Sequence, residues 1–68
     1  NPTQDELFIE SSVDIESIRI LTLQGKIVFQ EDRSGRKTSL STKNWPSGVY
    51  IIAVETSLGW SQHKMIKS

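Results

Sequence analysis

The sequence contains no cysteine, which excludes disulfide cross-links and any metal site built on thiolate ligands, although it leaves the redox compartment open. Its eight basic and eight acidic side chains cancel, whereas nucleic-acid-binding proteins usually carry a basic excess. It also lacks an apolar run of about 20 residues, the length that a helix needs to cross a bilayer. Within these residues, then, neither a disulfide-stapled scaffold, nor a nucleic-acid-binding protein, nor a membrane-spanning helix is expected.

The chain is also short. Its 68 residues limit it to one domain, and a chain of this size buries only roughly 60% of the surface that it exposes when unfolded. The first residues, NPTQDEL, lack the basic and apolar regions of a secretory signal. Because the chain begins with Asn1 and Pro2 instead of methionine, we expect it to be a segment of a longer protein, with any export signal upstream.

Helical periodicity is scarce as well. β-Branched and aromatic residues recur, and turn residues interrupt them about every eight to twelve positions, which is the pattern of an all-β sandwich or barrel. Gly25 and Gly59 are placed to close two hairpins, since glycine adopts a positive φ at little steric cost. We therefore expect strands at residues 6–10, 16–23, 26–31, 36–41, 49–56 and 60–67, with 36–41 at an edge.

The longest apolar run follows directly on a group of turn residues, in the segment NWPSGVYIIAVE (residues 44–55). Pro46 and Gly48 fit the second and fourth positions of a type I turn that begins at Trp45. The strand behind this turn is apolar on both faces, which is typical of the middle of a sheet with cover on both sides. We expect it to be the central strand, with residues 60–67 paired beside it.

Residues suited to catalysis or metal binding are few. His63 is the single histidine, and a pair with Ser61 on the same strand face lacks an orienting third group and a visible oxyanion hole. Zinc bound at His63 would need carboxylates as its remaining ligands. The acidic residues favour solvated turns over a catalytic cleft, although a weak cation site at Glu31 and Asp32 stays open. We expect no catalytic residue, no cofactor and no metal.

The two tryptophans and the terminal lysines leave alternatives. Trp45 and Trp60 could stack on sugars in an adhesive or carbohydrate-binding module, but we favour packing of each ring at an end of a thin sandwich. Lys64 and Lys67 are typical of a solvated edge that resists strand-to-strand aggregation, and they would equally suit recognition by a partner.

Four segments in order, NPTQDEL, IRILTLQGKIV, LSTKNWPSGVYIIAVET and HKMIK, resemble the C-terminal sorting domain of type IX secretion cargo proteins of Bacteroidetes. No single motif is specific, but together the segments span essentially the whole chain. Trp45 stands where the family more often has leucine, a conservative change for a buried apolar anchor. The matching positions are Asn1, Pro2, Gly25, Lys26, Pro46, Gly48, Tyr50 and the tail Lys64, Met65, Ile66 and Lys67.

The resemblance implies a fold, a route and partners. It implies one immunoglobulin-like antiparallel β-sandwich of about six to seven strands over residues 1–68, at the end of a larger exported protein. It further implies export through the periplasm to the outer-membrane surface or beyond. The implied partners are the type IX outer-membrane translocon and a sortase-like surface protease that removes the domain and attaches the cargo to anionic lipopolysaccharide. The domain would be a substrate of this machinery and no enzyme.

Recognition is expected at the last strand. Under this hypothesis the translocon contacts Lys64, Met65, Ile66 and Lys67 through the exposed edge of the strand, by addition of a strand to the sheet. Lys64 and Lys67 would contribute charge steering, which acts more on association rate than on affinity. Exposed edges also predict that the isolated domain can associate with itself.

Overall fold

Seven strands make up about two thirds of the part of the chain that the computed structural model describes, namely residues 2–3 and 5–67, with side chains from residue 5 onward. The six predicted strands are confirmed, each with its ends within one residue of the prediction, and a short N-terminal strand is added. The strands are β1 (Pro2–Thr3), β2 (Glu6–Glu10), β3 (Ile15–Thr22), β4 (Ile27–Asp32), β5 (Lys37–Ser41), β6 (Gly48–Thr56) and β7 (Gly59–Lys67).

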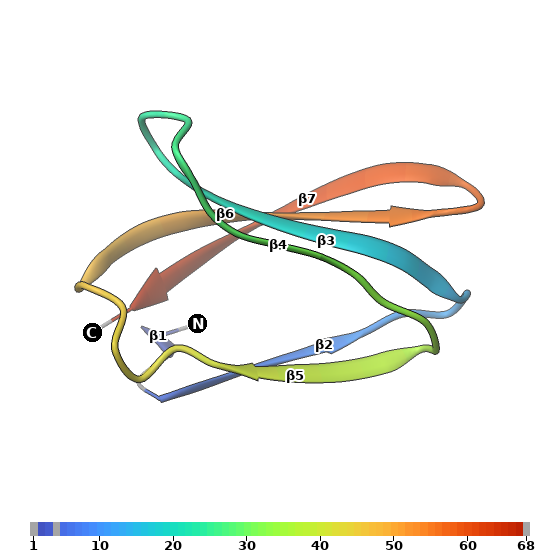
Figure 1. The fold of residues 1–68 in the computed structure, drawn as a ribbon, viewed down its shortest axis with the longest axis horizontal. Coiled ribbons are helices and arrows are strands. Elements are labelled where there is room, and N and C mark those ends of the chain that lie inside the picture. The colour runs from blue at the N-terminus through green and yellow to red at the C-terminus, as the bar shows by residue number, and fades with distance from the viewer. Residues whose placement is uncertain (1, 4, 68) are drawn as a thin grey trace.

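The strands form two sheets that pack face to face (Figure 1). The larger sheet has the order β1-β7-β6-β3-β4, and the smaller sheet pairs β2 with β5. All pairs are antiparallel except β1 with β7, which is parallel. The predicted small antiparallel β-sandwich is thereby confirmed. The edge position predicted for residues 36–41 is confirmed as well, because β5 lies in the two-stranded sheet, where each strand is an edge.

The core lies between the sheets and is built by alternation along the strands. On β3, Ile18 and Ile20 are completely buried, and on β6 every second side chain from Tyr50 onward faces the same interior. Full burial of a side chain of this size contributes roughly 1.5–3 kcal/mol, so a few positions account for much of the stability. The buried cluster consists of Leu7, Ile15, Ile18, Ile20, Leu40, Tyr50, Ile52, Val54 and Met65.

A β-bulge at the start of β3 brings one more isoleucine into this core. Ile15 pairs with Thr56 and Ser17 pairs with Glu55, so the pairing advances by two residues on β3 while it advances by one on β6. The extra residue reverses the alternation, because a bulge shifts the following side chains to the other face. Ile15 and Ile18 therefore both point inward although they are three positions apart, an offset that places two side chains on opposite faces of a regular strand, and Ile15 is only 2% exposed.

The central position predicted for residues 49–56 is confirmed, since β6 lies between β7 and β3. The expectation that both faces are covered is wrong for the outer face, because the two-stranded sheet covers only the inner face. On the outer face Val49 and Ile51 remain half-buried, whereas Ala53 is buried between neighbouring strands. Long side chains supply the cover there: the Arg19 guanidinium lies 5.2 Å from the ring centroid of Trp60.

The segment before β6 is fixed differently from the predicted type I turn at residues 45–48. The backbone N–H of Trp45 donates to the carbonyl of Thr42 at 3.0 Å, so the hydrogen-bonded turn lies three residues earlier. The Tyr50 hydroxyl donates to the carbonyl of Pro46. The Trp45 ring packs against Tyr50, with centroids 5.3 Å apart, and against Phe29 at 6.5 Å. Side chains, more than a backbone turn, therefore hold Pro46 against the sheet.

We predict that Tyr50→Phe lowers the free energy of unfolding by about 1 kcal/mol, because it removes the hydrogen bond to Pro46 and keeps the ring in the core. For a domain of this size the melting temperature should fall by about 4–8 °C. Denaturant unfolding followed by tryptophan fluorescence measures the change, with Ser39→Ala, an exposed hydroxyl on β5, as the control. Equal stabilities for Tyr50→Phe and the parent chain would show that this hydrogen bond has no net effect.

Candidate recognition surface

Most of the motif residues singled out in the sequence lie at one end of the sandwich, which we name the motif end. The start of β6 pairs with the end of β7, so Gly48 faces Lys67 and Tyr50 faces Met65. β1 lies on the other side of β7, with Pro2 opposite Ile66. Figure 1 shows β1, the end of β7 and the start of β6 on the same side of the molecule. Asn1, the remaining motif position of this group, lies outside the described residues.

The β3–β4 hairpin reaches the same end. Thr22 pairs with Tyr50, and the turn beyond it carries Gly25 at φ +92°, a left-handed conformation that glycine adopts at little cost, as predicted. Between this hairpin and the segment before β6 lies a hollow of about 440 Å³. Its walls include Leu23, Lys26 and Val28 on one side and Pro46, Gly48 and Val49 on the other. The two central motifs thus meet across one surface depression.

The four residues predicted for translocon recognition divide between the two faces of β7. Met65 and Lys67 point inward and are only 3% and 7% exposed, because alternate residues of a strand point to opposite faces. Lys64 and Ile66 point outward, and Ile66 is 47% exposed. A partner that meets the folded domain from outside therefore reaches the side chains of Lys64 and Ile66, while Met65 belongs to the core. The role of all four in recognition stays a prediction.

Ile66 belongs to an apolar surface that the sequence reading missed. On the outer face of the large sheet Ile66 lies beside Val49, and Ile51 lies between Lys64 and Leu21. Exposed apolar patches on small proteins often mark interaction sites. The sequence shows that β3 and β6 carry apolar residues on both faces, but only the structure shows that one of these faces has no second sheet over it. We name the set the outer apolar patch: Leu21, Leu23, Ile27, Val49, Ile51 and Ile66.

The two tryptophans do not form one stacking platform. The Trp45 ring packs against Phe29 and Tyr50 toward the core. Trp60 lies on the outer face beside Arg19 and is 48% exposed. A sugar-binding role would therefore depend on Trp60 alone.

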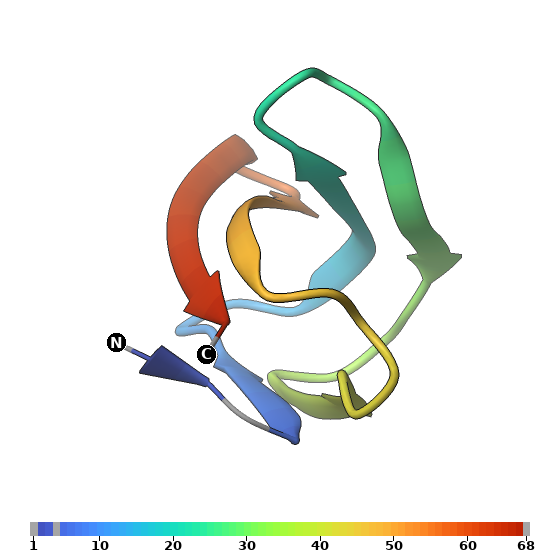
Figure 2. The ribbon, with the colours of Figure 1, turned by 90° about the vertical axis from the view of Figure 1, so that its left-hand side faces the viewer.

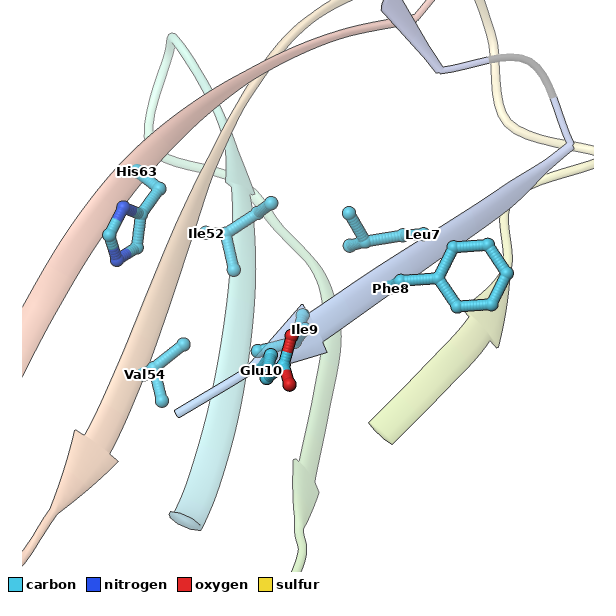
Figure 3. Close-up of a pocket in the computed structure, with 7 residues that line it drawn as sticks. All are labelled: Leu7, Phe8, Ile9, Glu10, Ile52, Val54 and His63. Atoms are coloured by element: carbon cyan, nitrogen blue, oxygen red, sulfur yellow. The ribbon is translucent and has the colours of Figure 1, made fainter. Parts of the chain in front are cut away.

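His63 lies in a mainly apolar setting. It lines a second pocket, of about 200 Å³, with Ile52 and Val54 of β6 and with Leu7 and Ile9 of β2 (Figure 3). Residues 5–67 show no group of three or more His, Asp or Glu side chains that could hold a metal ion. The geometry assembles no nucleophile, base and orienting group around His63.

The acidic pair Glu31 and Asp32 is no stronger as a cation site. The Glu31 carboxylate forms an ion pair with Arg33, with 2.9 Å between the carboxylate Oε1 and the arginine Nε. This neighbouring cation competes with any metal ion for the same oxygens. The weak cation site left open by the sequence therefore gains no support from the geometry.

Comparison with known proteins supplies one match. Residues 1–68 match the family described as the secretion system C-terminal sorting domain. No curated protein and no solved structure matches the chain. In the described part of the chain, no helix has the length and apolar character needed to cross a membrane.

Proposed function

The chain belongs to the family of type IX secretion system C-terminal sorting domains, and from this we propose that its motif end is the surface that the translocon recognises. A domain of this family is a sorting signal, which directs export across the outer membrane to the cell surface or the extracellular space. A sorting domain is not itself catalytic, so any chemistry belongs to the parent protein. Residues 1–68 act in this proposal as one sandwich domain.

The observation that carries the proposal is the convergence of the motif residues around the outer apolar patch. Pro46, Gly48 and Lys26 line the hollow that adjoins Val49, and Val49 lies beside Ile66 of the last strand. An apolar surface next to a lysine provides both burial and charge steering for a partner. Recognition of a folded shape also accounts for motif residues that are dispersed along the sequence but adjacent in space.

Strand addition to β7 remains part of the proposal, but it is limited to the part of the β7 edge that β1 does not occupy. β1 already occupies the edge beside the last two residues of β7. Among the described residues, the edge beside residues 60–65 has no neighbouring strand, so a translocon strand would pair there. The translocon would then contact the side chains of the outer apolar patch together with the backbone of this edge.

Proteolytic release is the second step that we propose. A sortase-like surface protease would remove the domain, and the cargo would be attached to anionic lipopolysaccharide. Proteases cut exposed, irregular segments in preference to packed strands. Because β2 to β7 build one core, cleavage should fall upstream of β2 and leave the sandwich intact.

The test is a transfer experiment in a bacterium that has a type IX system. Residues 1–68 are appended to a periplasmic reporter, and surface exposure is measured by protease shaving and antibody labelling of whole cells. We expect the reporter at the surface in the parent strain and in the periplasm of a strain without the translocon. A reporter that stays in the periplasm of the parent strain, with its appended domain folded and intact, would contradict the proposal.

A further inference from the structure

One edge of β7 is largely uncovered. Along one edge β7 pairs with β6 over its whole length, from Thr56 opposite Gly59 to Gly48 opposite Lys67. On its other side, within the described part of the chain, only β1 is present, and it spans the last two residues. Beside residues 60–65 the backbone N–H and C=O groups that point away from β6 therefore have no strand to pair with. Proteins usually cover or blunt an edge of this length.

The pocket that contains His63 lies on the inner side of β7, next to this edge. Its apolar lining comes from Leu7 and Ile9 of β2 and from Ile52 and Val54 of β6 (Figure 3). The smaller sheet has two strands where the larger sheet has five, so it covers only part of the larger sheet's inner face (Figure 2). A strand added to β7 would close the pocket with its inward side chains.

The pairing of β1 indicates which segment fits there. β1 runs parallel to β7, with Pro2 opposite Ile66 and Thr3 opposite Lys67. Followed backwards from Pro2, the same register places the residues upstream of Asn1 opposite residues 64 to 60 in turn. We propose that the parent-protein segment immediately upstream of Asn1 extends β1 along the free edge of β7 and closes the pocket.

The occupant is thus a stretch of the same polypeptide with a definable character. It should be extended, with apolar side chains at alternate positions toward the pocket and without proline at the positions that donate to β7. The inference rests on the proposed function in one respect: a C-terminal sorting domain follows a parent sequence. Because one strand edge accepts one partner, a translocon strand would pair with β7 only after it displaces the upstream segment.

Hydrogen exchange tests the inference directly. Amide exchange is compared between the 68-residue chain and the same chain extended by its native upstream residues. The amides of residues 60–65 that point away from β6 should exchange at least about tenfold more slowly in the extended chain, because strand pairing protects them. β4 (Ile27–Asp32), the opposite edge of the same sheet, is the internal control and should be unchanged. Equal exchange at residues 60–65 in the two chains would overturn the inference.

Thiol labelling gives a second readout, because the chain has no cysteine of its own. His63→Cys places a thiol at the pocket, and Lys64→Cys places the matched control on the outer face of the same strand. Extension of the chain should slow labelling of His63→Cys about tenfold and leave Lys64→Cys unchanged. Unchanged labelling of His63→Cys overturns the inference.

The other occupants of the edge give distinguishable results. Protection of residues 60–65 that rises with the concentration of the 68-residue chain, and is no greater in the extended chain, identifies a second copy and overturns the inference. If residues 60–65 of the extended chain are protected only when the translocon is added, the translocon is the occupant of the edge and the inference is overturned. Neither readout requires secretion, so the inference and the sorting function can fail independently.

Discussion

Replacement of Ile20 by alanine is expected to unfold the isolated chain, or to leave it with no cooperative melting transition. Ile20 is 0% exposed and lies on β3 between Ile52 of β6 and Phe29 of β4. A buried isoleucine truncated to alanine loses about 2–5 kcal/mol, from transfer and from the cavity that remains. A core in a chain of this size rarely supplies more than about 3–5 kcal/mol. One substitution therefore removes a large part of the net stability.

Thermal melting followed by circular dichroism measures this loss, with Leu23→Ala as the control. Leu23 is an apolar residue of the β3–β4 turn and is 63% exposed, so its truncation should change stability by no more than about 0.5 kcal/mol. Melting of the Ile20 variant within a few degrees of the parent would place the stabilising core elsewhere. Because the chain has no disulfide to hold the unfolded state together, nothing else compensates for the lost packing.

The fold was largely predictable because local and global signals agree. Alternation along β3 places Ile18 and Ile20 on its inner face, and alternation along β6 does the same for Ile52. Gly25 and Gly59 mark the two hairpins with positive φ. Consistency of this kind between pattern and turn chemistry is what allows a sequence to specify one fold. Two features had no local signal: β1 is too short to show a pattern, and the bulge after Ile15 has no distinctive residue type.

The candidate surface was less predictable, because it depends on strands that are distant in the sequence. The division of the tail into outward Lys64 and Ile66 and inward Met65 and Lys67 follows from alternation and could have been read from the sequence. The hollow between the β3–β4 turn and Pro46 could not, because it arises only when β3 pairs with β6. Nor could the exposure of the outer face, since a strand that is apolar on both faces normally indicates two covering layers.

Substitution of Ile66 by aspartate is expected to block surface export without unfolding the domain. Ile66 is 47% exposed at the edge of the outer apolar patch, so a carboxylate there stays hydrated in the free domain and would be desolvated when a partner covers the patch. Each 1.4 kcal/mol of this cost weakens binding about tenfold, and we expect surface delivery of the reporter to fall by at least that factor. Protease shaving of whole cells quantifies the delivery.

Two variants separate recognition from folding. Leu58→Asp introduces the same charge at a side chain that is 82% exposed in the β6–β7 turn, at the opposite end of β7 from Ile66, and it should export normally. Ile66→Thr keeps the β-branched shape that strands favour while it reduces the apolar surface, so export should fall several-fold with little change in melting temperature. Deletion of residues 65–68 would be less informative, because Met65 is 3% exposed and its loss damages the core as well as the tail.

The outcome decides whether the translocon reads a folded surface. If Ile66→Asp melts like the parent chain and is not exported, whereas Leu58→Asp is exported, the outer apolar patch contributes contacts that the buried side chains of β7 cannot. If Ile66→Asp is exported as well as the parent, side-chain recognition at the patch is wrong, and the unpaired edge beside residues 60–65 remains as the surface available to the translocon. The two surfaces lie on one strand, so the melting temperature of each variant must accompany its export measurement.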